Sequence, residues 1–204
     1  MADNITIKDA SQANVVVATQ DIAGVHFQRT APYEPPTFFA VFDRIAPAAN
    51  KYMATLFNTS ATRVVRVQQI WQLNWQVAAV TGVSLEQYAA FITARTSGTA
   101  VTSRSYDTAD TLSAGIAADT NSTSVTESYI FNRQLAVSEE GSAVGSQLGE
   151  DFRAQDRNFQ LIWERTKAAK GFTLRQNQGI TIRNVTNSTV GTVSYFFEFT
   201  DEPV

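Results

Sequence analysis

The sequence predicts an all-β fold, a two-sheet sandwich of jelly-roll type with an extended N-terminal arm. Apolar runs rich in β-branched and aromatic residues recur along the chain, as strands require. Asn followed by two Ser or Thr residues separates such runs within 52–67 and 180–195, and these side chains stabilise turns. From residue 37 onward we count about eight strands, the number of a jelly roll. Alternation alone does not distinguish this connectivity from an immunoglobulin-like one.

Residues 1–36 are predicted to form the arm, which ends in a proline-rich hinge. Two β-rich runs, Asn14–Thr19 and Val25–Arg29, precede the segment Ala31–Pro36. The prolines of that segment fix φ and lack an N–H donor, so regular structure is expected to stop there. The alternative is that these runs form a first hairpin of the main domain, which spans residues 37–204.

The strands of the main domain follow from apolar runs and from alternation. The last one is the clearest, because apolar residues recur at every second position from Val193 to Phe199. In the run Thr62–Leu73, one set of alternate positions is largely apolar and includes Trp71, which predicts that this set faces the core. The other predicted strands are Thr37–Asp43, Lys51–Phe57, Val125–Val137, Asn158–Arg165 and Phe172–Arg175.

Three segments between these strands lack a clear strand pattern. Residues 83–95 fit a helix with a Ser84–Gln87 capping box, but they also fit a buried strand, and we favour the strand because all neighbouring runs are strands. Residues 96–121 and 138–155 are polar and rich in small residues, so they are predicted to be long exposed loops. Such loops often carry function.

Composition narrows the classes of function. The net charge of −3 and the scatter of 12 Arg and 4 Lys along the chain argue against nucleic-acid binding. The absence of cysteine excludes disulfides, thiolate metal sites and cysteine nucleophiles. The sequence shows no secretory leader and no apolar run of about 18 residues, so neither secretion nor a membrane span is expected.

No set of residues predicts an enzyme, a cofactor or a metal. His26 is the only histidine and has no Gly-x-Ser-x-Gly partner motif, so we interpret it as a strand residue. The paired carboxylates are interpreted as solvated loop charge, and a calcium site at the three aspartates of the first loop is the weaker hypothesis. These residues are Glu139, Glu140, Glu150, Asp151, and Asp107, Asp110, Asp119.

Three tryptophans, Trp71, Trp75 and Trp163, raise the alternative of a sugar-binding face. Each lies in an apolar run, so core packing is the favoured interpretation.

Four segments resemble tailed-bacteriophage virion proteins, namely Asn50–Gln68, Thr93–Thr102, Leu174–Thr200 and Val17–Arg29. The resemblance covers most of the chain and is greatest to capsid decoration (cement) proteins with a β-sandwich or jelly-roll body. It implies a non-enzymatic protein that forms trimers on the shell and braces neighbouring capsid subunits. It identifies no individual functional residue.

Together these observations predict a phage structural protein that decorates and stabilises the outer capsid surface after assembly in the host bacterial cytoplasm. The expected partners are the major capsid protein and copies of the chain itself, as a homotrimer, without nucleic acid, membrane or cofactor. The alternative is a carbohydrate-binding or connector module of a phage tail or fibre. Partner contacts are expected on the arm and hinge, at Ile5, Val15, Val17, His26, Phe27, Arg29, Pro32, Tyr33, Pro35 and Pro36.

Overall fold

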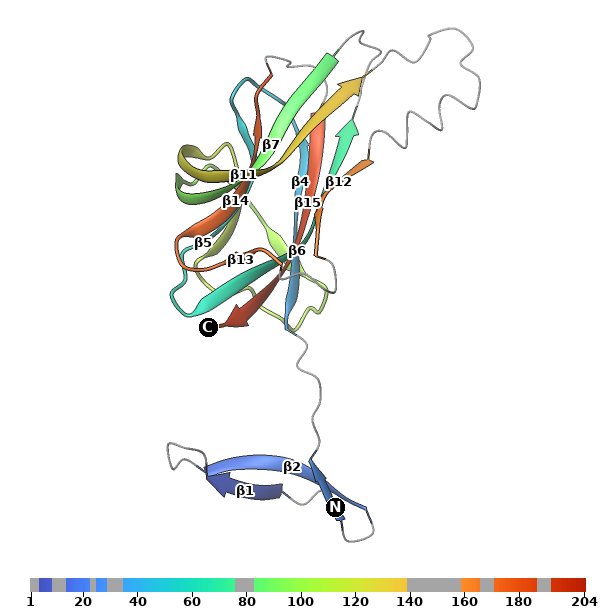
Figure 1. Ribbon diagram of the computed structural model, residues 1–204, viewed down its shortest axis with the longest axis vertical. Helices are drawn as coiled ribbons and strands as arrows, with labels where there is room; N and C mark the ends of the chain where they lie inside the picture. The colour runs from blue at the N-terminus through green and yellow to red at the C-terminus, as the bar shows by residue number, and fades with distance from the viewer. Residues whose placement is uncertain are drawn as a thin grey trace, which may run out of the picture. The chain divides into compact units, whose positions relative to one another are not determined.

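The computed structural model describes three strands near the N-terminus and most of the remaining chain (Figure 1). The described residues are 4–8, 14–22, 25–28, 35–75, 83–138, 159–165, 171–186 and 192–204. They contain strands, turns and bends but no helix, and so offer no helix long and apolar enough to cross a membrane. The all-β prediction is confirmed.

The chain divides into two compact units, Met1–Glu34 and Pro35–Val204. The first unit is a three-stranded antiparallel sheet of β1 (Asn4–Lys8), β2 (Asn14–Ile22) and β3 (Val25–Gln28), in that order. β2 contains the first of the two predicted β-rich runs and β3 contains the described part of the second, Val25–Gln28, whereas β1 was not predicted.

The second unit contains eight principal strands, which pair as one long hairpin folded on itself. The outgoing strands are β4 (Thr37–Ile45), β5 (Tyr52–Asn58), β6 (Arg63–Trp75) and β7 (Val83–Thr96). The returning strands are β11 (Thr123–Ser138), β12 (Phe159–Glu164), β14 (Gln178–Asn184) and β15 (Thr192–Pro203). β4 pairs with β15, β5 with β14, β6 with β12 and β7 with β11, all antiparallel. This is the jelly-roll arrangement, so the structure settles the connectivity that alternation left open.

Successive strand pairs of the hairpin alternate between two sheets that face each other (Figure 1). The β15 sheet has the order β12-β6-β15-β4-β9, where β9 is Ser103–Ser105, and β13 (Thr173–Leu174) also pairs with β6. The β14 sheet has the order β11-β7-β14-β5-β10-β8, where β8 is Thr99–Val101 and β10 is Ile116–Thr120. β7, the segment that fitted either a helix or a strand, is therefore a strand between β11 and β14.

Residues 96–121 are not the long loop that the sequence predicts, because they include β8, β9 and β10. β10 pairs with β5, so that Ala118 lies opposite Leu56, and β5 is thereby flanked on both sides. Paired backbone groups need no water, which favours burial of both strands. Small residues such as Ala118 have little strand propensity of their own, so the sequence did not indicate this strand. The second predicted loop, 138–155, lies outside the described residues except for Ser138.

The core lies between the two sheets and is built largely from aromatic and branched side chains. The alternation predicted for the last strand is confirmed, since Tyr195, Phe197 and Phe199 are buried whereas Phe196 is half-exposed. The ring centroids of Phe42 and Phe197 lie 5.0 Å apart. The largest fully buried side chains are Tyr195, Phe38, Phe42, Phe197, Phe199, Met53, Leu56, Ile70, Ile92, Leu174, Ile180 and Ile182.

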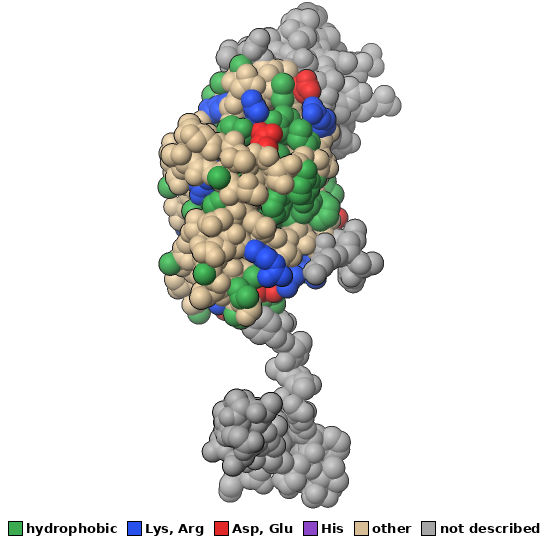
Figure 2. Space-filling view, turned by 60° about the vertical axis from the view of Figure 1, so that its left-hand side comes forward, with side chains coloured by type: hydrophobic (Ala, Val, Ile, Leu, Met, Phe, Trp, Pro, Cys, Tyr) green, Lys and Arg blue, Asp and Glu red, His purple; other side chains and the backbone are tan. Residues whose placement is uncertain are grey.

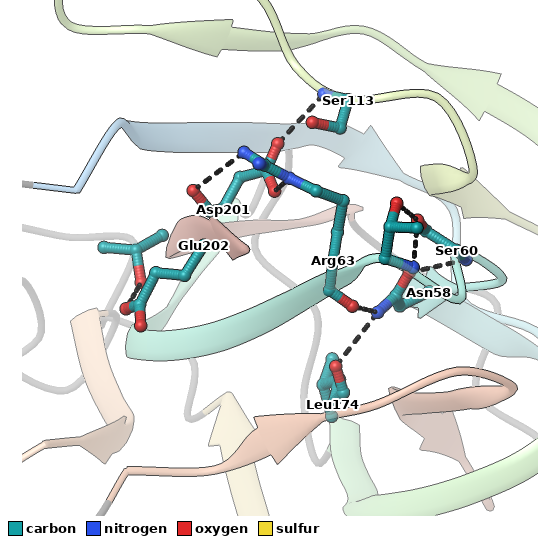
Figure 3. Close-up of polar contacts among 9 residues, drawn as sticks. Asn58, Ser60, Arg63, Ser113, Leu174, Asp201 and Glu202 are labelled. Carbon is teal, nitrogen blue, oxygen red and sulfur yellow. Dashed lines mark hydrogen bonds and ion pairs between the residues drawn. The ribbon is translucent and has the colours of Figure 1, made fainter. Parts of the chain in front are cut away.

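Buried asparagines stabilise a turn at each end of the sandwich. The turn predicted within 52–67 is confirmed at Asn58, whereas the one predicted within 180–195, at Asn187, lies outside the described residues. At the end of β5, Asn58 donates from Nδ2 to the carbonyls of Arg63 and Leu174, and its Oδ1 accepts from the Ser60 backbone N–H at 2.8 Å (Figure 3). At the end of β14, Asn184 bonds in the same way to Ala48 and Thr186. Both asparagines are fully buried, so each replaces backbone partners that the turn would otherwise lack.

Candidate interaction surface

Large apolar side chains form a row across the outer face of the β15 sheet. Val41, Phe196, Trp71 and Leu161 occupy opposed positions on β4, β15, β6 and β12. Opposed residues lie on the same face of a sheet. Their chain neighbours, such as Phe197, are buried between the sheets, so the row faces outward. Val41 is 44% and Leu161 40% exposed.

Two further aromatic residues extend this row. Phe39 lies against Phe196, with ring centroids 5.8 Å apart, and Tyr106 lies against Phe39 at 5.0 Å. Tyr106 is 60% exposed, and its hydroxyl donates to Glu198 Oε2 at 2.8 Å, which holds the ring in place. We call the six residues the apolar band: Phe39, Val41, Trp71, Tyr106, Leu161 and Phe196.

Partial burial, the hydrogen bond to Glu198 and the charge of that carboxylate raise the pKa of Tyr106 from 10.0 to about 12. The folded state thus favours the neutral phenol, so this contribution to stability is complete below pH about 10 and is lost as the pH rises toward 12. We expect Glu198→Gln to lower the pKa of Tyr106, measured by tyrosinate absorbance as the difference between each protein and its Tyr106→Phe counterpart. Identical titration curves for the wild type and Glu198→Gln would contradict the assigned hydrogen bond.

A bulge in β6 places Trp71 in the band rather than in the core. Val67 lies opposite Phe199 but Gln69 lies opposite Glu198, so Gln68 is an extra residue on β6. An extra residue exchanges the two faces of a strand beyond it. Before the bulge the odd-numbered residues Val65 and Val67 face the core, and after it the even-numbered residues Ile70 and Gln72 do. Trp71 therefore faces outward. The prediction that Trp71 shares the core-facing set is wrong for this reason.

The structure does not bring the tryptophans together as one sugar-binding face. Trp163 on β12 lies opposite Ile70 and packs against Phe172, with ring centroids 4.2 Å apart. It therefore belongs to the interior side of the β15 sheet, as the core-packing interpretation predicted. The side chain of Trp75 lies outside the described residues.

The outer face of the β14 sheet differs, because its aromatic side chains are held in a polar network. Glu127 accepts hydrogen bonds from the hydroxyls of Tyr52 and Tyr88, and Arg183 Nη1 lies 3.2 Å from the same carboxylate. The Arg183 guanidinium also lies over the Tyr52 ring, 5.2 Å from its centroid. Burial and then the bond to Glu127 raise the pKa of Tyr52 to about 12. These groups are satisfied by one another, so this face offers fewer free apolar contacts than the band.

The chain contains few charged residues for its length. Figure 2 shows one face of the body, on which uncharged polar side chains and backbone predominate and hydrophobic side chains gather in one area. Charged residues make up 17% of the chain. Where charged side chains are few, exposed apolar side chains are less often separated by charges than they are on an ordinary protein surface.

The predicted contact residues fall in three groups. Ile5, Val15 and Val17 lie on paired strands, with Ile5 opposite Val17, and His26 and Phe27 lie on β3 opposite Asp21 and Gln20. Arg29, Pro32 and Tyr33 lie outside the described residues. Pro35 and Pro36 are the first residues of the second unit, where the Pro36 carbonyl accepts from the Asp201 N–H at 3.1 Å.

At the end of the sandwich where β15 finishes, a buried carboxylate organises three segments (Figure 3). Asp201 accepts from Arg63 Nε at 2.6 Å through Oδ1 and from the Ser113 backbone N–H at 3.0 Å through Oδ2. The carboxylate is 1% exposed, whereas the Arg63 side chain is 27% exposed. Both oxygens are engaged with the protein itself, so Asp201 acts as a structural clamp.

The aspartates of the weaker calcium hypothesis do not converge. Asp107 accepts from the Ala109 N–H at 2.9 Å in a local turn, while Asp119 is buried in an ion pair with Arg95. Among the described residues no cluster of three His, Cys, Asp or Glu side chains is suited to a metal ion. The carboxylate pairs Glu139–Glu140 and Glu150–Asp151 lie outside the described residues.

The band thus gathers three of the six exposed large hydrophobic side chains of the described body, namely Val41, Tyr106 and Leu161. No signal in the sequence indicated this surface, although Trp71 and Leu161 lie in runs that were predicted to be strands. No known protein family, no curated protein and no solved structure matches the chain.

Proposed function

We propose that the chain is a non-enzymatic virion structural protein of a tailed bacteriophage, which decorates the outer capsid surface and stabilises the shell. Its partners in this proposal are the major capsid protein and two further copies of the chain. The sequence resemblance to cement proteins motivates the proposal, and a rigid jelly-roll scaffold is compatible with it. The band is the observation that carries it.

The band has the properties of a protein-binding surface. It combines aromatic residues with branched aliphatic ones, and aromatic residues are enriched at the centres of interfaces. Its rings are held by one another and by Glu198, so little side-chain freedom remains to be lost on binding. The strands beneath it are paired on both sides in the centre of the sheet, which gives a firm base for repeated contacts on a lattice.

The buried ion pairs of the second unit stabilise its fold. Asp201 and Asp119 are each almost fully buried and are paired with Arg63 and Arg95. Such pairs fix neighbouring loops in one arrangement, which suits a scaffold whose surface must match several partners. A trimer needs two different complementary patches on each copy, and the N-terminal arm is our candidate for one of them, whereas the band is our candidate for the contact with the capsid.

The first test compares capsids with and without the protein during heating and during dilution into low salt. We expect undecorated capsids to lose integrity earlier. Equal stability of the two preparations would refute the cement role.

The second test locates the contact. The double variant Val41→Glu/Leu161→Glu is expected to bind capsids at least about tenfold more weakly, because charges placed in an apolar contact lose their hydration. Both positions are at least 40% exposed, so the melting temperature should change little. Ile130→Glu is the matched control, since Ile130 is a 38% exposed aliphatic residue on β11 of the other sheet. Unchanged binding by the double variant would exclude the band as the contact.

A further inference from the structure

We propose that a groove at one side of the sandwich binds a carboxylate-bearing sugar unit of an acidic saccharide. This inference does not depend on the capsid role. The groove has a volume of about 510 Å³, which is within the usual range for ligand sites. Six residues supply its recognition chemistry: Arg66, Phe91, Tyr129, Phe172, Arg175 and Gln178.

An aromatic platform forms one wall of the groove. Tyr129 on β11 lies parallel to Phe91 on β7, with ring centroids 5.3 Å apart and an angle of 4° between the planes. Phe91 is buried, but Tyr129 is 49% exposed, so one of the two rings remains available. A ring held flat in advance loses little entropy on binding, and its apolar face with a polar hydroxyl suits the C–H face and hydroxyl rim of a sugar.

The groove also presents a set of hydrogen-bond donors. The Gln178 Oε1 accepts from the Arg175 backbone N–H at 2.9 Å, which leaves the Gln178 amide nitrogen as the end available to a ligand. The Arg175 side chain is exposed at the same turn. Arg66 is held by Glu202, at 2.8 Å from Nε to Oε2, so its charge is largely compensated within the protein. One uncompensated guanidinium together with an amide donor suits a carboxylate surrounded by hydroxyls.

The same features argue against other occupants. A nucleic acid would require several cations along its backbone. Among the described residues that line this groove, Arg175 is the one cation without an ion-pair partner, in a chain of net charge −3. A peptide that adds a strand requires an evenly spaced edge. β11, the edge strand next to the groove, pairs with β7 through repeated register shifts between Thr123 and Asn132, and such irregularities oppose strand addition.

Binding can be measured by calorimetry or saturation-transfer NMR at low ionic strength with three acidic probes: trigalacturonate, α2,8-linked disialic acid and a hyaluronate hexasaccharide. The methyl ester of trigalacturonate, which has the same rings without charge, is the matched neutral ligand. We expect at least one acidic probe to bind and added salt to weaken that binding. Trigalacturonate should bind at least about tenfold more tightly than its neutral methyl ester.

Two variants test the assigned chemistry. Arg175→Gln removes the charge and Tyr129→Ser removes the platform, and each is expected to weaken binding at least about tenfold. Arg104→Gln and Ile130→Ser are the controls, because Arg104 is an exposed arginine outside the groove and Ile130 is an exposed residue next to Tyr129 on β11 that does not line the groove. If Tyr129→Ser fails to fold, Arg175→Gln still decides, since its side chain is exposed.

Several results would overturn the proposal. These are no binding of any acidic probe at millimolar concentration, equal binding of acidic and neutral forms, or equal losses in the groove variants and the controls. Binding of a single-stranded thymidine oligonucleotide that Arg175→Gln abolishes, without saccharide binding, would assign the groove to nucleic acid instead. The capsid test uses the residues of the band, so failure of either hypothesis is visible without the other.

Discussion

Replacement of Asp201 by Ala is expected to lower the free energy of unfolding by about 3 kcal/mol. The change leaves Arg63 Nε and the Ser113 backbone N–H without their acceptor at a position where the carboxylate is 1% exposed. Removing one member of a buried pair costs more than the pair contributes, because the remaining group stays desolvated. We place the value at the lower end of the usual range because the Arg63 side chain still reaches water. Urea unfolding measures the change.

The neighbouring ion pair provides the control. Glu202 bonds to Arg66 at 2.8 Å, and both side chains are partly exposed, at 18% and 31%. Glu202→Ala should therefore cost no more than about 1 kcal/mol. Asp201→Asn keeps one acceptor oxygen and should fall between the two alanine variants. A loss for Asp201→Ala no larger than that for Glu202→Ala would show that the clamp does not hold the end of the sandwich together.

Replacement of Gly179 by Ala is expected to destabilise the body by about 3 kcal/mol, at the upper end of the range for overpacking. Gly179 is buried on β14 between β5 and β7. A Cβ atom there would lie 2.5 Å from the Leu56 carbonyl oxygen and 2.5 Å from Phe57 Cδ2, and 3.2 Å from Ile92 Cγ1. Thermal and urea unfolding measure the loss.

A second substitution separates the two contacts. Phe57→Leu in the Gly179→Ala background removes the ring contact but not the backbone contact with Leu56, so we expect only partial recovery of stability. Full recovery would mean that the ring alone opposes the methyl group. A Gly179→Ala protein within about 0.5 kcal/mol of the wild type would show that the strands separate easily, contrary to the close packing described.

Much of the fold could be predicted because local signals agreed with the tertiary structure. β15 alternates apolar and polar residues along most of its length, and Tyr195, Phe197 and Phe199 are buried as that alternation requires. Asn58 is followed by Thr and Ser, which is typical of a turn, and it lies in a turn in the structure. Where the local signal was weak the prediction failed, as for β10, whose small residues are ordered by pairing with β5 rather than by their own propensity.

The candidate surfaces were harder to predict than the strands. The band requires Trp71 to lie opposite Phe196 and Leu161, and these residues are far apart in sequence. The groove joins Tyr129 to Arg175 and Gln178 across the fold. No periodicity within a single segment contains this information, because register between strands is set by the whole hydrophobic pattern and by bulges.

The β class, the positions of most strands and the turn at Asn58 could be predicted from local sequence, because side-chain period, branching and local hydrogen bonding act over a few residues. The jelly-roll order and the face that each residue occupies follow from contacts between distant strands. The single extra residue Gln68 in β6 exchanged the two faces beyond it and placed Trp71 outside. Such a bulge depends on how β6 and β15 pair, and that pairing joins residues more than a hundred positions apart in the chain.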